Sequence, residues 1–281
     1  MKKHKKLTIT IIILIIISVT IAINGIYCTN TIEVNNYKIS SDKTNANLHF
    51  VLISDLHNKE FGKDNCDLVE KIKEQKPDFI AVGGDMVTRY VNDDSVMKNV
   101  LTQLAQIAPT YCCLGNHEHD LEDTIDFKTD ITSTGAVLLD NESTEFVKNG
   151  ETIIIGALSD FPYYEFNAPN YDTPERYYWD EFKEQSKNNY SILLHHQPEY
   201  IGDISKGTDI DLILCGHTHG GLIDIPFVGG LFAPNQGLFP KYDKGEFDFD
   251  NTKMIISSGL GNSNPLFRIN NCAEICVIDV N

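Results

Sequence analysis

The chain has 281 residues and a formal net charge of −17, which arises from 40 acidic and 23 basic residues. Nucleic-acid binding depends on clustered lysine and arginine, so this balance argues against nucleic acid as a partner. An acidic protein can still take anionic substrates where bound cations supply a local positive field.

A basic tip and an apolar helix are the first elements expected. Four lysines within the first six residues precede an unbroken run of Ile, Leu, Val, Thr, Ser and Ala over residues 7–23. Extended to Tyr27, the run would form a helix of about 31 Å, which matches a hydrocarbon core of about 30 Å. It exceeds a usual signal-peptide core, and no A-x-A-like cleavage site follows, so a retained anchor is favoured over a cleaved signal. Because flanking lysines stay in the cytoplasm, the sequence predicts a single-pass cell-membrane protein with an extracytoplasmic domain.

Three segments follow from this division. Residues 1–28 form the cytoplasmic tip and transmembrane anchor, and residues 29–46 form a tether with a first edge strand. Residues 47–281 form one domain, since no repeat or clear linker interrupts them after residue 46. About 250 residues suit one large domain or two small ones.

Cysteine usage points to the opposite compartment. The chain has seven cysteines, most of them inside apolar runs, where a thiol behaves as a small hydrophobe. No C-x-x-C pair occurs, so neither a thiolate metal site nor a redox motif is expected. Unpaired buried thiols are more typical of a reducing setting. We give the orientation of the anchor precedence, because a buried thiol is tolerated outside the cell.

Strand, polar loop and helix alternate in the first half of the domain. Residues 49–54, 79–82 and 110–114 are short apolar runs that predict buried strands. Helices are expected after the first two runs, one capped at residue 64 or 65 and one with apolar residues 96, 100, 101, 104 and 107 on one face. This alternation indicates an α/β sheet with polar loops at the carboxyl ends of its strands, where ligands bind in such folds.

Strands outnumber helices in the second half, which suits a second sheet packed on the first. Residues 144–148 and 151–157 are joined by Asn149 and Gly150, a strong hairpin signal. Further strands are expected over residues 191–194, 212–215, 254–257 and 274–280. Between them, residues 161–182 are rich in aromatic side chains, which could form a flap, a membrane-facing patch or ordinary packing; we favour packing.

Oxygen and imidazole donors follow five of the predicted strands. They are Asp55 with His57, Asp85, Asn116 with His117, His196, and His217 with His219. Singly, each residue has an ordinary alternative as a helix cap, a turn residue or a structural histidine. In an extended H-x-H segment the two rings point to opposite faces, which suits two neighbouring ions better than one. Together, such donors select Mn, Fe or Zn over thiol-loving ions.

The ordered set D-x-H, G-D, G-N-H-E, H and G-H-x-H resembles the calcineurin-like metallophosphoesterase superfamily. More narrowly it resembles the membrane-anchored bacterial branch similar to the YkuE and YaeI phosphodiesterases, over about residues 48–280. The resemblance implies a four-layer α/β/β/α sandwich of two mixed sheets behind the N-terminal transmembrane helix, and a centre of two divalent ions. One ion would be held by Asp55, His57 and His219 and the other by Asn116, His196 and His217, with Asp85 bridging and His117 meeting the substrate.

The implied activity is hydrolysis of a phosphoric ester. Two divalent ions lower the pKa of a bridging water and clamp a phosphoryl group for in-line attack. We expect a phosphodiesterase or pyrophosphatase, and the anchor favours a lipid- or envelope-linked substrate. The alternatives are a phosphodiesterase acting on soluble nucleotides and a non-catalytic interaction module on the same fold.

Three positions leave alternatives open. His195 precedes His196, and we choose His196 because the ligand of this branch lies two residues before proline. Glu118 stands where the branch more often has Asp, which puts only the orientation of His117 in doubt. Arg268 could hold a phosphate through its planar guanidinium or lie in a solvent-exposed loop.

Overall fold

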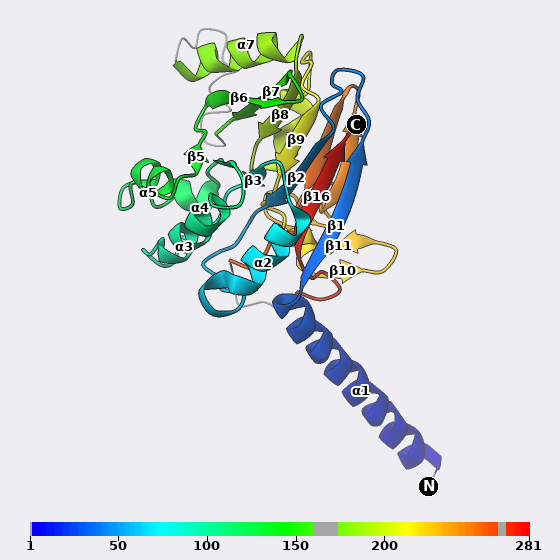
Figure 1. The fold of residues 1–281 in the computed structure, drawn as a ribbon. Coiled ribbons are helices and arrows are strands. Elements are labelled where there is room, and N and C mark those ends of the chain that lie inside the picture. Colours follow the sequence, from blue (N-terminus) through cyan, green and yellow to red (C-terminus); the bar gives the residue numbers. More distant parts are fainter. Residues whose placement is uncertain (1, 160–173, 264–267) are drawn as a thin grey trace.

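Two six-stranded mixed sheets form the centre of the protein in a computed structural model that describes residues 2–159, 174–263 and 268–281. The first sheet has the order β1-β16-β2-β3-β4-β5 and the second the order β14-β15-β9-β8-β7-β6. Helices cover the two outer faces, so the layers follow the α/β/β/α arrangement (Figure 1). The predicted fold class is therefore confirmed.

The first sheet and its helices come from the N-terminal half and the last strand. The strands are β1 (Ile32–Ile39), β2 (Leu48–Ile53), β3 (Ile80–Val82), β4 (Thr110–Cys112), β5 (Val137–Leu138) and β16 (Ala273–Val280). Helices α2 (Cys66–Gln75), α3 (Ser95–Leu104) and α5 (Phe127–Ser133) pack on its outer face, and α4 (Asn116–His119) follows β4. The apolar face predicted to reach residue 107 ends earlier, because α3 stops at Leu104 and Ile107 lies in the turn before Pro109.

The second sheet comes from residues 142–256. Its strands are β6 (Glu142–Lys148), β7 (Glu151–Ala157), β8 (Tyr190–Leu194), β9 (Leu212–Cys215), β14 (Gly245–Phe249) and β15 (Thr252–Ile256). Helices α7 (Pro174–Ser186) and α8 (Ile201–Ile204) cover it. The predicted hairpin at Asn149 and Gly150 joins β6 to β7. Residues 161–173 of the aromatic stretch lie outside the described residues, whereas Trp179 and Phe182 pack on this sheet, as ordinary packing requires.

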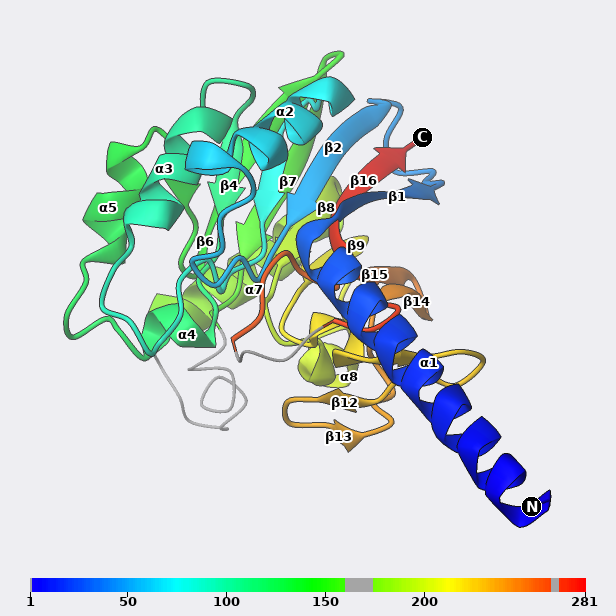
Figure 2. The same cartoon turned by 90° about the horizontal axis from the view of Figure 1, so that it is seen from below.

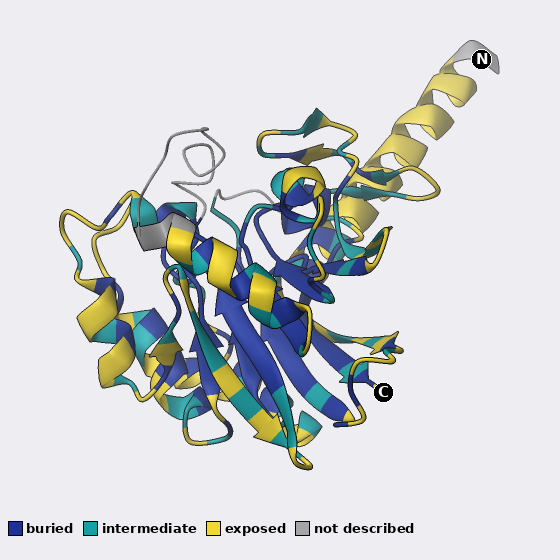
Figure 3. Ribbon diagram, turned by 90° about the horizontal axis from the view of Figure 1, so that it is seen from above, coloured by how far each residue is buried: buried dark blue, intermediate teal, exposed yellow. Residues whose placement is uncertain are grey.

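Apolar side chains fill the space between the two sheets. Phe50 and Phe79 stack there with ring centroids 4.4 Å apart, beside buried residues of β7, β8 and β9. Figure 3 shows these central strands as almost continuously buried. Strands buried on both faces read as unbroken apolar runs, which is why the sequence revealed them.

Strand directions place the ends of β2, β3 and β4 close to the N-terminal helix. β1 begins two residues after α1 (Lys2–Asn30) ends, and β16 runs parallel to β1. β2 runs antiparallel to β16, whereas β3 and β4 run parallel to β2. The carboxyl ends of β2, β3 and β4 therefore lie at the end of the sheet from which α1 leaves.

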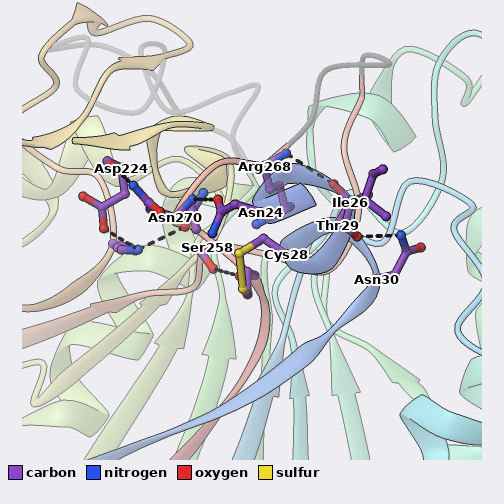
Figure 4. The surroundings of a disulfide bond; sticks show 12 residues. Asn24, Ile26, Cys28, Thr29, Asn30, Asp224, Ser258, Arg268 and Asn270 are labelled. Atoms are coloured by element: carbon purple, nitrogen blue, oxygen red, sulfur yellow. Dashed lines mark hydrogen bonds and ion pairs between the residues drawn. A yellow bond between two sulfur atoms is a disulfide. The ribbon is translucent and has the colours of Figure 1, made fainter. Parts of the chain in front are cut away.

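Helix α1 projects away from the sheets (Figure 1). Residues His4–Asn30 are long and apolar enough to cross a membrane, and a signal sequence would meet the same criteria. The last turn of α1 contacts the domain through a disulfide between Cys28 and Cys272, and Thr29 Oγ1 accepts a hydrogen bond from Arg268 N (3.3 Å; Figure 4). Lys59 Nζ also donates to the Thr29 carbonyl, where the negative end of the helix dipole favours a cation.

The disulfide was not foreseen from the sequence. Of the remaining cysteines, Cys112, Cys113, Cys215 and Cys276 are buried and Cys66 is exposed. Four buried thiols agree with the expectation that cysteine here serves as a small hydrophobe. The pairing itself joins residues 244 positions apart, a separation that no local pattern encodes.

Candidate metal centre

Unusual backbone conformations present the predicted site residues at the strand ends. Five of them have a positive φ: Asp55 (55°), His57 (49°), Asp85 (54°), His217 (70°) and His219 (51°). A left-handed conformation costs a residue with a side chain about 1–2 kcal/mol. Such strain persists where the surrounding structure compensates it, and it gathers at functional sites.

One group of donors comes from the ends of β2 and β9. Asp55, His57 and His219 each offer a ligand atom, and these atoms lie within 4.8 Å of one another. His57 Nε2 is 3.3 Å from His219 Nε2, while Asp55 Oδ1 is 3.8 Å from His57 Nε2 and 3.7 Å from His219 Nε2. A single cation would fit these three residues.

A second group comes from the ends of β3, β8 and β9. Asp85, His196 and His217 also offer atoms within 4.8 Å of one another, and His196 Nε2 lies 3.1 Å from Asp85 Oδ2. The same Asp85 oxygen lies 3.8 Å from His57 Nε2, in the first group. Asp85 is thus placed between two groups of donors, as a bridging carboxylate must be.

Hydrogen bonds orient two of the imidazoles toward the carboxylates. His57 Nδ1 lies 3.2 Å from Val87 O, and His196 Nδ1 lies 2.7 Å from Gly83 O. Because a carbonyl oxygen only accepts, each Nδ1 carries the proton and each Nε2 presents its lone pair inward. Metal-bound histidines are commonly held in this way.

Asn116 lies at the start of α4, directly after β4. Its Oδ1 is buried and accepts no hydrogen bond within the described parts of the chain. A buried amide oxygen without a donor is costly, and a cation would compensate it. The orphaned oxygen and the lone pairs of the oriented histidines therefore fit a bound metal.

Burial keeps three of the imidazoles neutral. It lowers the pKa of His217 and of His219 to about 3, and that of His117 to about 4. Burial acts to raise the pKa of the Asp55 and Asp85 carboxyls, but the facing histidines outweigh it and hold both below their ordinary value. Neutral imidazole and ionised carboxylate are the forms that bind a metal.

The sequence comparison agrees with this geometry. Residues 48–221 match the family model described as calcineurin-like phosphoesterase, which covers more than half of the chain. The chain belongs to this family. It is therefore a phosphoester hydrolase, the resemblance seen in the motifs is confirmed, and the family uses divalent metals.

Two bacterial relatives and one solved structure illustrate the relationship. The phosphodiesterase YaeI of Escherichia coli is 28% identical over 263 residues, covering 88% of each chain. The metallophosphoesterase YkuE of Bacillus subtilis is 30% identical over 219 residues, covering 75% of this chain and 71% of YkuE. GAP50, the anchor in the inner membrane complex of Plasmodium, shares the fold with a TM-score of 0.50 at 14% identity, over 83% of this chain and 80% of GAP50.

Close packing against Gly216 holds the Asp55 carboxylate of this phosphoesterase in place. A Cβ built on Gly216 would lie 2.3 Å from Asp55 Oδ2 and 2.0 Å from Ser54 Oγ. The Gly216 position therefore has no room for a side chain. Its neighbour His217 donates its backbone N–H to both Asp55 oxygens (3.1 Å each).

Glu118 has a role in this family member that the sequence did not reveal. Its carboxylate is buried and accepts four backbone hydrogen bonds of 2.7–3.1 Å, from Asp85 N, Met86 N, Val87 N and Gly115 N. Burial, and then the charge of Asp85, raises the pKa of Glu118, but four donors and no acceptor favour its ionised form. Glu118 thus fastens the loop after β3 to the loop after β4.

The structure bears on two positions that the sequence left open, His196 and Arg268. His196 faces Asp85, whereas His195 directs its Nδ1 to Leu158 O (3.0 Å), which agrees with the choice of His196. Arg268 is fully buried and donates to Gly261 O and Asn262 Oδ1 (2.6 and 2.9 Å), so the alternative that it lies in a solvent-exposed loop is wrong.

Two further polar residues border the centre without a sequence signal. Asn235 Nδ2 lies 3.4 Å from His217 Nε2 and donates to Glu199 Oε1 (2.7 Å). Glu199 Oε1 itself is 3.9 Å from His217 Nε2. Glu199 lies in a short 3-10 helix (Pro198–Tyr200) and Asn235 in the turn between β12 and β13. Neither segment has a recognisable motif, and only a pattern of conservation among relatives could have indicated these residues.

Proposed function

We propose that the chain is a phosphodiesterase or pyrophosphatase that works with two divalent ions. The observation that supports this best is the position of Asp85, whose Oδ2 lies 3.1 Å from His196 and 3.8 Å from His57. Asp55, His57 and His219 would hold one ion, Asn116, His196 and His217 the other, and Asp85 both. Mn, Fe and Zn suit these donors. Such a pair of ions supplies an activated water and neutralises charge on a phosphoryl group.

His117 is proposed as the residue that meets the substrate. Its Nδ1 accepts a hydrogen bond from Arg89 N (3.0 Å), so the proton of the neutral ring is on Nε2. That nitrogen lies 3.9 Å from Asp85 Oδ2, at the inner side of the centre. From there the neutral Nε2–H can donate a hydrogen bond to the charge on the phosphoryl group. Protonation of the leaving oxygen would require the doubly protonated ring, which burial disfavours.

The membrane attachment supports a lipid- or envelope-linked substrate. We infer that residues 1–28 are a retained anchor, that 29–46 contribute β1, and that 47–281 are the catalytic domain. A disulfide between Cys28 and Cys272 supports the extracytoplasmic face, because such bonds persist in oxidising compartments. If the chain hydrolysed soluble nucleotides as fast as a lipid-linked phosphoester, the alternative of a general phosphodiesterase would be favoured.

Metal content and turnover measured on the same full-length preparations test the assignment. We expect Asp85→Ala to lose both metal and activity, and His117→Ala to retain metal but lose about 10²–10⁴-fold in turnover. His49→Gln, at the opposite end of the sheet, is the matched histidine control and should have the metal content and turnover of the native chain. Rates on a monoester and a diester with added Mn²⁺ would define the preferred bond. Full activity of Asp85→Ala would refute the bridging role.

A further inference from the structure

The segment of the chain between the H-x-H turn and strand β14 carries exposed apolar side chains. Segment 222–240 carries a single charged residue, Asp224. It forms two small hairpins, β10 (Asp224–Ile225) with β11 (Gly229–Gly230), and β12 (Phe232–Ala233) with β13 (Gly237–Leu238). Its exposed apolar side chains, here called the apolar rim, are Phe227 (108% exposed), Val228 (61%), Phe232 (45%), Leu238 (66%) and Phe239 (58%).

The base of the first hairpin is fastened to the end of α1. Asn270 N donates to Asn24 Oδ1 of α1 (2.8 Å), and Asn270 Nδ2 donates to Asp224 O of the hairpin (3.3 Å; Figure 4). Ile223 pairs with Ile269 in the same connection. Figure 1 shows β10 and β11 beside the domain end of α1, and Figure 2 shows β12 and β13 on the same side of the molecule.

The other side of these hairpins borders the metal centre. A Cβ built on Gly221 would lie 2.3 Å from Gly230 Cα, so the first hairpin packs directly against the H-x-H turn. Asn235, in the turn of the second hairpin, lies 3.4 Å from His217. The apolar rim, the end of α1 and the metal centre therefore occupy one end of the molecule.

We propose that the apolar rim inserts into the bilayer interface around α1 and turns the metal centre toward the lipid headgroups. Large exposed apolar groups on a soluble surface usually mark an interaction site. The occupant is the membrane because the hairpin that carries Phe227 and Val228 is linked through Asn270 to α1, an apolar helix that leaves the domain beside this hairpin (Figure 1). The net charge of −17 opposes electrostatic adsorption on anionic lipids, so apolar contact must provide the attachment.

The substrate class follows from this orientation and rests on the proposed function. A metal centre that faces the interface meets phosphate esters carried by membrane lipids before it meets soluble ones. The phosphoryl group would reach the donors at the ends of the strands while the acyl chains remain in the bilayer. The structure thus assigns the chain a lipid-borne phosphoester as substrate.

Depth-dependent fluorescence quenching tests the docking without using activity. The chain has one tryptophan, Trp179, so a Trp179→Phe background allows one reporter at a time. Phe227→Trp reports on the rim. Val147→Trp is the control reporter, because Val147 is also an exposed apolar residue (61%). Val147 also lies near the β6–β7 turn, at the opposite end of the parallel strands from the carboxyl ends of β8 and β9.

The full chain would be reconstituted into phosphatidylcholine vesicles with and without brominated acyl chains. We expect at least a threefold larger loss of Phe227→Trp fluorescence than of Val147→Trp fluorescence. Equal quenching of the two reporters would overturn the docking. It would also be overturned if neither reporter were quenched more than free tryptophan is in the same vesicle suspension.

A pair of rates separates this inference from the proposed function. Phe227→Ser combined with Val228→Ser should lower turnover of a nitrophenyl phosphodiester carried on diacylglycerol about tenfold, and leave bis-nitrophenyl phosphate hydrolysis unchanged. Equal rates of the variant and native chain on the lipid-borne ester would overturn the substrate assignment. If the native, metal-loaded chain hydrolysed neither ester, the proposed function would be overturned. The quenching result would still decide the docking.

Discussion

Replacement of Glu118 by glutamine tests how the centre is built. The Glu118 carboxylate accepts two N–H groups on each oxygen, Met86 N and Val87 N on Oε1, and Asp85 N and Gly115 N on Oε2. Glutamine has one carbonyl oxygen and one NH2 group. Whichever way the amide lies, two backbone donors face another donor and lose their acceptor.

The magnitude follows from these two orphaned donors. Each buried donor left without a partner costs about 1–3 kcal/mol, so Glu118→Gln should lower the free energy of unfolding by about 2–6 kcal/mol. In a domain of this size 1 kcal/mol corresponds to about 2–4 °C in Tm. We therefore expect Tm to fall by at least about 4 °C. Either orientation of the amide removes a support from the loop that carries Asp85, so metal affinity should also fall by about 10–100-fold.

Near-ultraviolet circular dichroism during heating, together with metal content after dialysis against graded chelator, measures both effects. Glu122→Gln is the matched control, since the side chain of Glu122 is half exposed and pairs with His119 at the surface. Such surface pairs contribute at most about 1 kcal/mol. A Glu118→Gln chain with the Tm and the metal content of the control would refute the role of Glu118.

Three further changes have defined outcomes. Cys272→Ser removes a bond between residues 244 positions apart and should lower the free energy of unfolding by about 2–5 kcal/mol. Reductant should lower the Tm of the native chain to that of Cys272→Ser. A variant with the native Tm would argue against the bond. Gly216→Ala brings a Cβ to 2.3 Å from Asp55 Oδ2. Metal affinity, measured by chelator titration, should therefore fall about 10–100-fold. A Gly216→Ala chain with native metal affinity would contradict the steric argument. Burial opposes protonation of His49, but its hydrogen bond to Asp279 (2.6 Å) outweighs burial and raises the His49 pKa above 6.5. The stability gained from this bond is complete below pH 6.5 and is lost as the pH rises through the pKa of His49 in the folded state. It is worth less than about 1 kcal/mol. The Tm advantage of the native chain over His49→Gln should therefore shrink above pH 6.5 and not below it.

Much of the fold could be predicted because its central strands are buried on both faces. Runs such as 49–54 and 212–215 are apolar without interruption, and glycine or polar residues end them sharply. The hairpin at Asn149 and Gly150 was equally clear, since its turn needs residues that tolerate positive φ. The end of α3 was predicted less well, because apolar spacing alone does not show where a helix gives way to a turn.

The candidate site was predicted in its residue types and less fully in its support. Donors after successive strands were visible because parallel strands carry their loops to a common edge. Three of the four hydrogen bonds to Glu118 were not visible, since their donors belong to the loop after β3, which is distant along the chain. The burial of Arg268 was missed although Asn262 and Gly261, which bind its side chain, lie only six and seven residues away, because no local pattern shows how a loop folds back on itself.

The sequence by itself determined the apolar N-terminal helix, the buried strands and the chemistry of the donors, because each of these is encoded by neighbouring residues. Tertiary structure decided which residues meet. It placed Asp85 between two groups of histidines, paired Cys28 with Cys272, and brought the apolar rim beside α1. These outcomes depend on strand order, direction and register, which long-range packing establishes and which no local run of residues specifies.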